Sequence, residues 1–291
     1  MEEDQSILIV GHRGLLGREC LEILSARYRV SGVDIDRCDI TRPESVGAAL
    51  EEFRPGWVIN AAAVTDVDGC QADPVRAREV NARGPGNLAR ACREREIRLL
   101  QVSTDFVFDG EKTEPYREDD TPRPLSVYGE SKLKGEEAVI GAGGQFLIVR
   151  TSWLFGPGGK NFPGTILRAA RKTGRLEVVS DQRGSPTAAA DLAAGFGELI
   201  DRSASGIVHL TNRGDCSWYE YARFVLESAG LETEVVPIGS EELDRPAPRP
   251  RYSVLSLERY RRITGKLPRP WEEAVREYVL GIREWGMGNR E

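Results

Sequence analysis

The chain has 291 residues, of which 40% are hydrophobic and 30% are charged. This composition is typical of a folded globular protein with one large or two modest domains, and it is too apolar for a disordered chain. The formal net charge of −6 argues against bulk attraction to nucleic acid or to an anionic membrane. A phosphate-bearing ligand would therefore need local hydrogen-bond donors.

The sequence contains five cysteines and two histidines, and no C-x-x-C pair. This spacing suits neither a zinc site nor a thioredoxin-type redox motif, so we expect no bound metal. An odd cysteine count without an N-x-[ST] sequon, and a start without a signal-peptide pattern, predict a cytoplasmic protein. No stretch approaches the ~20 apolar residues of a membrane span.

Up to about residue 150, short apolar runs alternate with longer amphipathic segments, which predicts alternating strands and helices. We expect strands at 7–10, 28–33, 57–61, 97–103 and 146–150, and helices at 15–27, 43–53, 75–95 and 127–140. Such alternation implies right-handed βαβ crossovers and a parallel sheet covered on both faces. The expected fold class is α/β, with a Rossmann-type doubly wound sheet in a dinucleotide-binding domain at 1–153.

After residue 150 the alternation becomes less regular, and loops rich in Gly and Pro appear. Helices are still expected at 162–173, 188–201, 218–229 and 270–284. We expect 154–291 to form mainly a smaller C-terminal α/β lobe that binds the substrate. Segments near 176–205 are expected to return to the first domain.

A G-x-x-G-x-x-G loop joins the first predicted strand to the first predicted helix. Glycines without side chains let the backbone turn tightly and approach a pyrophosphate, which the free N–H groups of the helix N-terminus would bind. By itself this motif equally describes a glycine-rich turn, but its position after an apolar strand favours a dinucleotide site. The candidate cofactor residues of the loop are Gly11, His12, Arg13, Gly14, Leu15, Leu16 and Gly17.

The second predicted strand ends at Asp34, at the offset expected for an acid that binds the adenosine ribose. This carboxylate favours NAD(H), whereas the nearby Arg13 and Arg37 would accommodate the 2′-phosphate of NADP(H), so both cofactors stay open. Further residues at strand ends are candidates to border the adenine and ribose, although the alanines suit simple packing equally well. They are Asp39, Ile40, Ala61, Ala62 and Ala63.

Tyr128 and Lys132 are four residues apart and therefore lie on one face of a helix. An ammonium group beside a phenol lowers the phenol's pKa, and the lysine can also orient a nicotinamide ribose. Ser103-Thr104-Asp105 closes the fourth predicted strand, where hydroxyls face the ligand crevice of a doubly wound sheet. A plain turn and a solvated surface pair would account for each feature singly, but their joint occurrence behind a glycine loop predicts an oxidoreductase.

Six further stretches narrow this prediction. They are NAAAVTDVD at 60–68, VSTDFVFDG at 102–110, YGESK at 128–132, RTSWLF at 150–155, VSDQRGSPT at 179–187 and RPAPRPRYS at 245–253. With these stretches the chain resembles the dTDP-4-dehydrorhamnose reductase family of the extended short-chain dehydrogenase/reductase superfamily, and the similarity covers nearly its whole length.

The resemblance implies NAD(P)H-dependent reduction of the 4-keto group of dTDP-4-dehydro-β-L-rhamnose to give dTDP-L-rhamnose. Tyr128 would donate the proton, Lys132 would bind the cofactor ribose and lower the pKa of Tyr128, and Thr104 would hydrogen-bond the sugar. The other candidate substrate residues are Asp105, Phe106, Trp153, Asn161, Gln182 and Arg249. Trp153 equally suits a core tryptophan between the two domains.

Val64 stands where the family more often has an aromatic residue, and Gln71 stands where it often has a glutamate. These departures leave details of nucleotide packing and surface ion contacts open. Two other functions also stay open: a nucleotide-sugar 4-epimerase or dehydratase, and a dinucleotide-binding regulatory subunit of the S-adenosylmethionine synthetase type. The expected partner is a small nucleotide sugar, with no nucleic acid and no membrane. A homodimer is the assembly considered.

Overall fold

The computed structural model describes residues 6–288, with side chains up to residue 281. At its centre lies a six-stranded sheet whose neighbouring strands all run parallel. From edge to edge the strands are β10 (Gly206–His209), β5 (Phe146–Thr151), β4 (Arg98–Thr104), β3 (Trp57–Asn60), β1 (Ser6–Val10) and β2 (Arg29–Val33). The strand order reverses at β1, which is where a doubly wound sheet opens its ligand crevice. The predicted Rossmann-type fold is confirmed.

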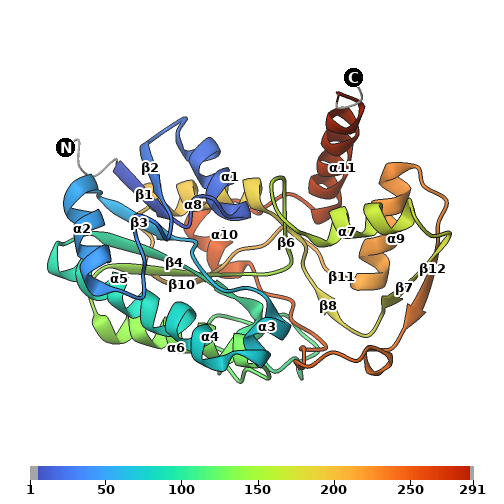
Figure 1. Ribbon diagram of the computed structural model, residues 1–291, viewed down its shortest axis with the longest axis horizontal. Helices are drawn as coiled ribbons and strands as arrows, with labels where there is room; N and C mark the ends of the chain where they lie inside the picture. The colour runs from blue at the N-terminus through green and yellow to red at the C-terminus, as the bar shows by residue number, and fades with distance from the viewer. Residues whose placement is uncertain (1–5, 289–291) are drawn as a thin grey trace.

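Helices cover both faces of the sheet (Figure 1). Side chains of β1 alternate between the faces: Ile7 and Ile9 join one hydrophobic cluster, and Leu8 and Val10 join another. The first face carries α1 (Leu15–Leu24) and α8 (Ala189–Asp201), and the second carries α2 (Pro43–Phe53), α5 (Gly84–Glu94) and α6 (Val127–Ala142). Because both faces are buried, the strands consist of nearly continuous apolar runs.

A smaller part of the molecule, at the right of Figure 1, has a hydrophobic core of its own that includes Phe155, Leu167, Tyr221 and Val275. Its helices are α7 (Phe162–Ala170), α9 (Trp218–Ala229) and α11 (Trp271–Gly288). Its short strands are β6 (Leu154–Phe155), β7 (Arg175–Val179), β8 (Arg183–Gly184), β9 (Thr187–Ala188), β11 (Cys216–Ser217) and β12 (Glu234–Ile238). Within residues 6–288, no helix has the length and apolar character needed to cross a membrane.

The segment that was expected to return to the sheet, 176–205, divides between the two parts. Helix α8 packs against α1 over the sheet, and the chain then adds β10 to the sheet edge. The stretch 176–188 stays in the smaller part, since β7 pairs with β12, β8 with β11 and β9 with β6. An apolar strand pattern does not specify its partner strand, so this detail differs from the expectation. The assignment of the two parts to cofactor and substrate stays a prediction.

The single helix predicted at 75–95 is interrupted. The structure has α4 (Pro74–Arg78), then a π-helical turn (Glu79–Arg83), then α5. Pro85 has no N–H to donate to the carbonyl of Asn81, so the regular ladder is lost there. The Asn81 side chain bonds the backbone of Val64 on both sides, at 2.9 Å each, and Ser131 of α6 at 3.1 Å. This turn fixes α6 against the loop after β3.

Two further short helices were not predicted. Helix α3 (Val67–Ala72) begins at Asp66, whose side chain accepts a hydrogen bond from the N–H of Gly69. Helix α10 (Glu258–Thr264) packs near β10 and α8. Both are too short to show a clear helical period in the sequence.

Candidate active site

The glycine loop lies at the carboxyl end of β1 and needs its glycines for two different reasons. Gly11 has φ of +84°, and a Cβ there would come within 2.7 Å of the backbone nitrogen of Ala62. A Cβ at Gly17 would lie 2.2 Å from the carbonyl oxygen of Gly11. The first glycine therefore brings the loop against β3, and the second brings α1 against the loop. Helix α1 begins after Gly14 without a side-chain cap, which leaves its N-terminal N–H groups for an anion.

Asp34, at the end of β2, lies against this loop. Its carboxylate accepts hydrogen bonds from the backbone N–H groups of Arg13, at 3.1 Å, and Ile35, at 3.0 Å. Both arginines considered for a 2′-phosphate have acidic partners: Arg13 pairs with Asp36 at 2.8 Å, and Arg37 pairs with Glu52. The acid predicted to bind a ribose is therefore beside the predicted phosphate loop.

A cavity of about 460 Å³ opens at the carboxyl ends of β1, β3, β4 and β5. We call it the Tyr128 cavity. It brings together twelve of the predicted site residues, drawn from the glycine loop, the β3 end, the β4 end, α6 and the β5–β6 connection. They are Gly14, Leu15, Leu16, Gly17, Ala61, Ala63, Thr104, Asp105, Phe106, Tyr128, Lys132 and Trp153. This is the edge at which a doubly wound sheet binds its ligands.

Other predicted residues do not line this cavity. Gly11, His12, Arg13, Asp34 and Ala62 are parts of the glycine loop or its immediate neighbours. Asp39 accepts hydrogen bonds from the backbone N–H and the hydroxyl of Thr41. The Ile40 side chain is buried and packs so closely on Gly84 that a Cβ there would clash with it. Asp39 and Ile40 therefore hold the chain after β2 in place.

Asn161 caps α7 and is not brought into the cavity. Its amide nitrogen donates to the carbonyls of Gly156 and Gly159 and to the hydroxyl of Tyr278, and its oxygen accepts from the N–H of Gly164. With these partners the side chain is held by its own loop and helix, so the structure does not bring it to the predicted sugar site. The sequence could have indicated this, because Asn followed by Phe-Pro is a typical helix start.

Helix α6 is seated so that its first turn faces the end of β4. Ser126 caps the helix by accepting from Gly129 at 3.2 Å, and Gln71 accepts from the N–H of Val127 at 3.2 Å. A Cβ at Gly129 would lie 2.2 Å from the carbonyl oxygen of Phe106. Only glycine allows this approach, and it places Tyr128 beside Thr104, with its ring edge-on to Phe106 at 5.6 Å.

The protonation of Tyr128 differs from the sequence expectation. Burial raises the pKa of its phenol above the ordinary value, the hydrogen bond with Thr104 lowers it in part, and the charge of Asp105 raises it. The predicted lowering by Lys132 is wrong, because the Lys132 ammonium donates to the carbonyl oxygen of Val102 at 2.7 Å. Burial lowers the pKa of Lys132 to about 8. The tyrosine is therefore kept in its protonated form, as a proton donor requires.

Two oxygens in the cavity wall are buried and have no hydrogen-bond partner. They are Asp105 Oδ2 and Thr151 Oγ1. Thr151 lies beside Thr104 in the register of β5 and β4. Burial raises the pKa of Asp105 to about 6, although hydrogen bonds from Ser253 and Thr104 lower it. Buried polar atoms without partners are rare and mark a place where a polar ligand fits.

Trp153 forms one wall of the cavity in a strained conformation, with φ of +46°. Its ring stacks on Trp218 of α9, with centroids 3.5 Å apart and planes 7° apart. A Cβ at Gly184 would lie 2.5 Å from its indole. Trp153 thus both lines the cavity and packs against the hydrophobic core of the smaller part. Trp218, which also lines the cavity, carried no motif and was missed.

A smaller cavity of about 50 Å³ adjoins the first and shares Phe106, Trp153 and Trp218 with it. Arg245, Arg249 and Gln182 form its polar side. The guanidinium of Arg249 pairs with Asp68 of α3 at 2.6 and 3.0 Å. Burial and the charge of Arg249 lower the pKa of Arg245. Two guanidinium groups close together form a site for a strongly charged anion.

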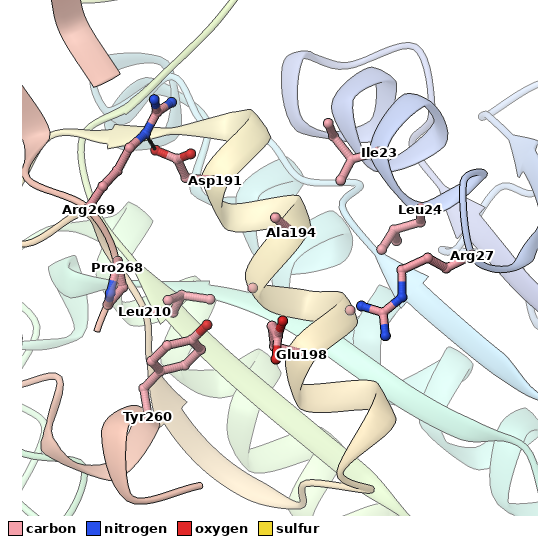
Figure 2. Close-up of a pocket in the computed structure, with 12 residues that line it drawn as sticks. Ile23, Leu24, Arg27, Asp191, Ala194, Glu198, Leu210, Tyr260, Pro268 and Arg269 are labelled. Atoms are coloured by element: carbon pink, nitrogen blue, oxygen red, sulfur yellow. Dashed lines mark hydrogen bonds and ion pairs between the residues drawn. The ribbon is translucent and has the colours of Figure 1, made fainter. Parts of the chain in front are cut away.

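A different cavity, of about 270 Å³, lies between α1, α8 and α10 (Figure 2). We call it the α8 cavity, and it holds no residue predicted for the site. Its charged side chains have ion-pair partners: Asp191 with Arg269 at 2.8 Å, Glu198 with Lys266 at 2.9 Å, and Arg27 with Asp201.

Comparison with known proteins agrees with this arrangement. A family model described as the RmlD substrate binding domain matches residues 5–283. Spore coat polysaccharide biosynthesis protein SpsK of Bacillus subtilis is 40% identical over 274 residues, 94% of this chain and 96% of that protein.

Two solved structures are also similar to this chain over nearly its whole length. A dTDP-4-dehydrorhamnose reductase from Clostridium acetobutylicum matches with a TM-score of 0.93 and 40% identity, over 96% of this chain and 99% of that one. Another, from Bacillus anthracis in complex with NADP, matches with a TM-score of 0.92 and 36% identity, over 97% and 100%. The chain therefore belongs to the dTDP-4-dehydrorhamnose reductase family.

Proposed function

We propose that this protein reduces the 4-keto group of dTDP-4-dehydro-β-L-rhamnose with NAD(P)H and releases dTDP-L-rhamnose. One observation carries the proposal: Tyr128, Thr104 and Lys132 meet in a cavity that also contains the start of α1. The names of the two solved relatives support the substrate, and the NADP in one of them supports the cofactor.

The residues present fit a nicotinamide dinucleotide. The loop at Gly11–Gly17 approaches β3 so closely that side chains would fill the space, and the N–H groups at the start of α1 suit a pyrophosphate. Asp34 would accept from the adenosine ribose, and Lys132 would donate to the nicotinamide ribose. The cofactor, when bound, supplies the hydride. The paired state of Arg13 and Arg37 favours NAD(H), although exposed ion pairs are weak enough to exchange for a phosphate.

The protein's own part in the reaction is to handle the proton and the charge on oxygen. As C4 gains a hydride, O4 becomes negative and takes the hydroxyl proton of Tyr128, which leaves a phenolate. The hydroxyl of Thr104 can donate to the same oxygen as its charge grows. The phenolate then returns to the neutral phenol by taking a proton from water.

The substrate would lie across the two adjoining cavities. The flat rings of Phe106 and Trp153 suit the apolar side of a hexose, and the unpartnered oxygens of Asp105 and Thr151 suit its hydroxyl groups. Arg245 and Arg249 would take the diphosphate. We propose that the larger part of the molecule binds the cofactor and the smaller part completes the sugar site. A cytoplasmic location and a homodimer stay predictions.

The test is a panel of 4-keto nucleotide sugars offered with NADH or NADPH, while the absorbance of the reduced nicotinamide is followed. We expect stoichiometric oxidation of the cofactor with a 4-keto sugar and none with dTDP-glucose, which has no keto group. Interconversion of epimers without net oxidation would instead identify an epimerase. If no sugar of the panel reacts and a larger synthetase subunit co-purifies with the protein, the protein would be identified as a regulatory subunit.

A further inference from the structure

One face of α6 carries three polar residues at intervals of one turn, and each bonds to a residue at the end of β4. Tyr128 meets Thr104, Lys132 meets the carbonyl of Val102, and Glu136 accepts a hydrogen bond from the hydroxyl of Ser103. The proposed mechanism uses the first two of these side chains. Glu136, the third, lies one turn deeper and is 2% exposed.

Glu136 forms a buried ion pair with Arg150 of β5. The Arg150 guanidinium donates to both carboxylate oxygens, with Nε at 2.9 Å from Oε1 and Nη2 at 2.6 Å from Oε2. Arg150 is itself 2% exposed. Its third nitrogen, Nη1, lies 3.5 Å from Nε2 of His209, and its guanidinium lies 5.1 Å from the ring centre of Phe108. The carboxylate is therefore held from two strands at once.

His209 completes this support without adding charge. Its Nδ1 lies 3.1 Å from the carbonyl of Tyr116, so Nδ1 carries the proton and Nε2 accepts from Arg150. Burial and the positive charge of Arg150 lower the pKa of His209 well below its ordinary value. The imidazole stays neutral, and Arg150 directs its charge at Glu136.

A fully buried ion pair is a weak source of stability, since desolvation offsets most of the attraction. Its place beside a buried lysine suggests another role. The titratable groups packed about Lys132 are Tyr128 and Glu136 on α6, Cys70 on α3 and Asp105 after β4. Of these, Glu136 favours the charged ammonium most strongly, against the effect of burial.

We propose that Glu136 is a positioning residue: supported by Ser103 and Arg150, it keeps the ammonium of Lys132 charged and aligned with the ribose of the nicotinamide cofactor. This inference rests on the proposed function for the identity of the cofactor. Glu136 does not line the Tyr128 cavity, whereas Lys132 does, so Glu136 acts through Lys132.

The test is the pH dependence of the dissociation constant for NADPH, measured by nicotinamide fluorescence on the wild type and on Glu136→Gln. Because burial lowers the pKa of Lys132 to about 8, wild-type binding should weaken as the pH rises through 8. Loss of a neighbouring opposite charge lowers such a pKa by ~1 unit or more. Glu136→Gln should therefore bind NADPH about fivefold more weakly than the wild type at pH 8, and within about twofold of it at pH 6.

Glu130→Gln is the matched control, since Glu130 lies on the exposed side of the same helix and pairs with Lys134 and Arg78. Its pH profile should follow the wild type. Glu136→Asp retains the charge and should restore most of the binding at pH 8. Because Glu136→Gln leaves a buried arginine unpaired, Glu136→Gln with Arg150→Gln removes both charges and provides a second measurement if the single variant does not fold.

A merely structural role predicts a constant loss of affinity at every pH. If the profiles of the Glu136→Gln variants superimpose on the wild-type profile after scaling, the proposal is overturned. NADPH binding needs no sugar, so this outcome is separate from the fate of the proposed function. If no 4-keto sugar reacts but NADPH binding shows the expected pH dependence, the proposed reductase activity is wrong and the role of Glu136 is supported.

Discussion

The Tyr128 cavity and the α8 cavity differ in how their polar groups are satisfied. In the α8 cavity, Asp191 and Glu198 face arginine or lysine partners at less than 3 Å, as Figure 2 shows for Asp191. In the Tyr128 cavity, Asp105 and Thr151 have buried oxygens without partners, and Lys132 loses much of its affinity for a proton through burial. The protein therefore tolerates the free-energy cost of buried, unpaired polar groups in the Tyr128 cavity. In the α8 cavity it avoids this cost through ion pairs. That cost marks a functional site better than the presence of a cavity does.

The largest effect is expected from Tyr128→Phe, which removes the proposed proton donor and keeps the ring. We expect kcat to fall by ~10²–10⁴-fold, because a positioned general acid contributes that much. The NADPH dissociation constant should change little, and stopped-flow single turnovers with the 4-keto sugar would measure the chemical step. A chemical step that proceeds at the wild-type rate would remove Tyr128 from the mechanism.

Asp105→Asn tests the electrostatic cost directly. The pKa of Asp105 is raised to about 6 by burial, so the stability associated with its protonated form is present below about pH 4 and is lost as the pH rises through 6. Raising the pKa of Asp105 from about 4 to about 6 corresponds to at most ~3 kcal/mol. Asp105→Asn should therefore be more stable than the wild type by ~1–3 kcal/mol at pH 8.

This gain should vanish near pH 4, where the wild-type carboxyl is protonated as well. Urea unfolding at pH 4, 6 and 8 measures it, and a difference in unfolding free energy that does not change with pH would contradict the prediction.

Trp218→Ala tests the aromatic wall of the Tyr128 cavity, because it removes the ring on which the strained Trp153 stacks. We expect KM for the nucleotide sugar to rise about tenfold, since an aromatic pair contributes ~0.5–1.5 kcal/mol beyond its burial. Affinity for the cofactor should stay within twofold. Trp218→Phe, which retains a stacking ring, is the control. Equal losses for sugar and cofactor would indicate a general disturbance of the fold.

The smallest effect is expected in the α8 cavity. Asp191→Asn weakens a partly exposed ion pair with Arg269, which keeps Glu277 as a second partner. Thermal unfolding should reveal a loss of no more than ~1 kcal/mol. Both kcat and KM should stay within twofold of the wild type. A large loss of activity would show that this cavity shares in the function, and the contrast drawn between the two cavities would then be wrong.

Most of the sheet could be predicted from the sequence, because its strands are apolar runs bounded by turns. The glycine loop and the pair Tyr128 and Lys132 were also recognisable, since their spacing reflects local geometry. The π-helical turn before α5 was missed although Pro85 was visible, because a proline near a helix start is usually harmless. The capping role of Asn161 was readable from the Phe-Pro that follows it, but the family resemblance pointed to a sugar contact instead.

What the sequence by itself determined was the fold class, the family, and the one-turn spacing of Tyr128 and Lys132 on a helix. All of these depend on residue type and on period along a single segment. Only the tertiary structure decided the protonation of Tyr128 and Lys132, the stacking of Trp153 on Trp218 and the pairing of Glu136 with Arg150. Those properties arise from burial and from contacts between distant segments, because the free energy of a charge depends on what surrounds it in space.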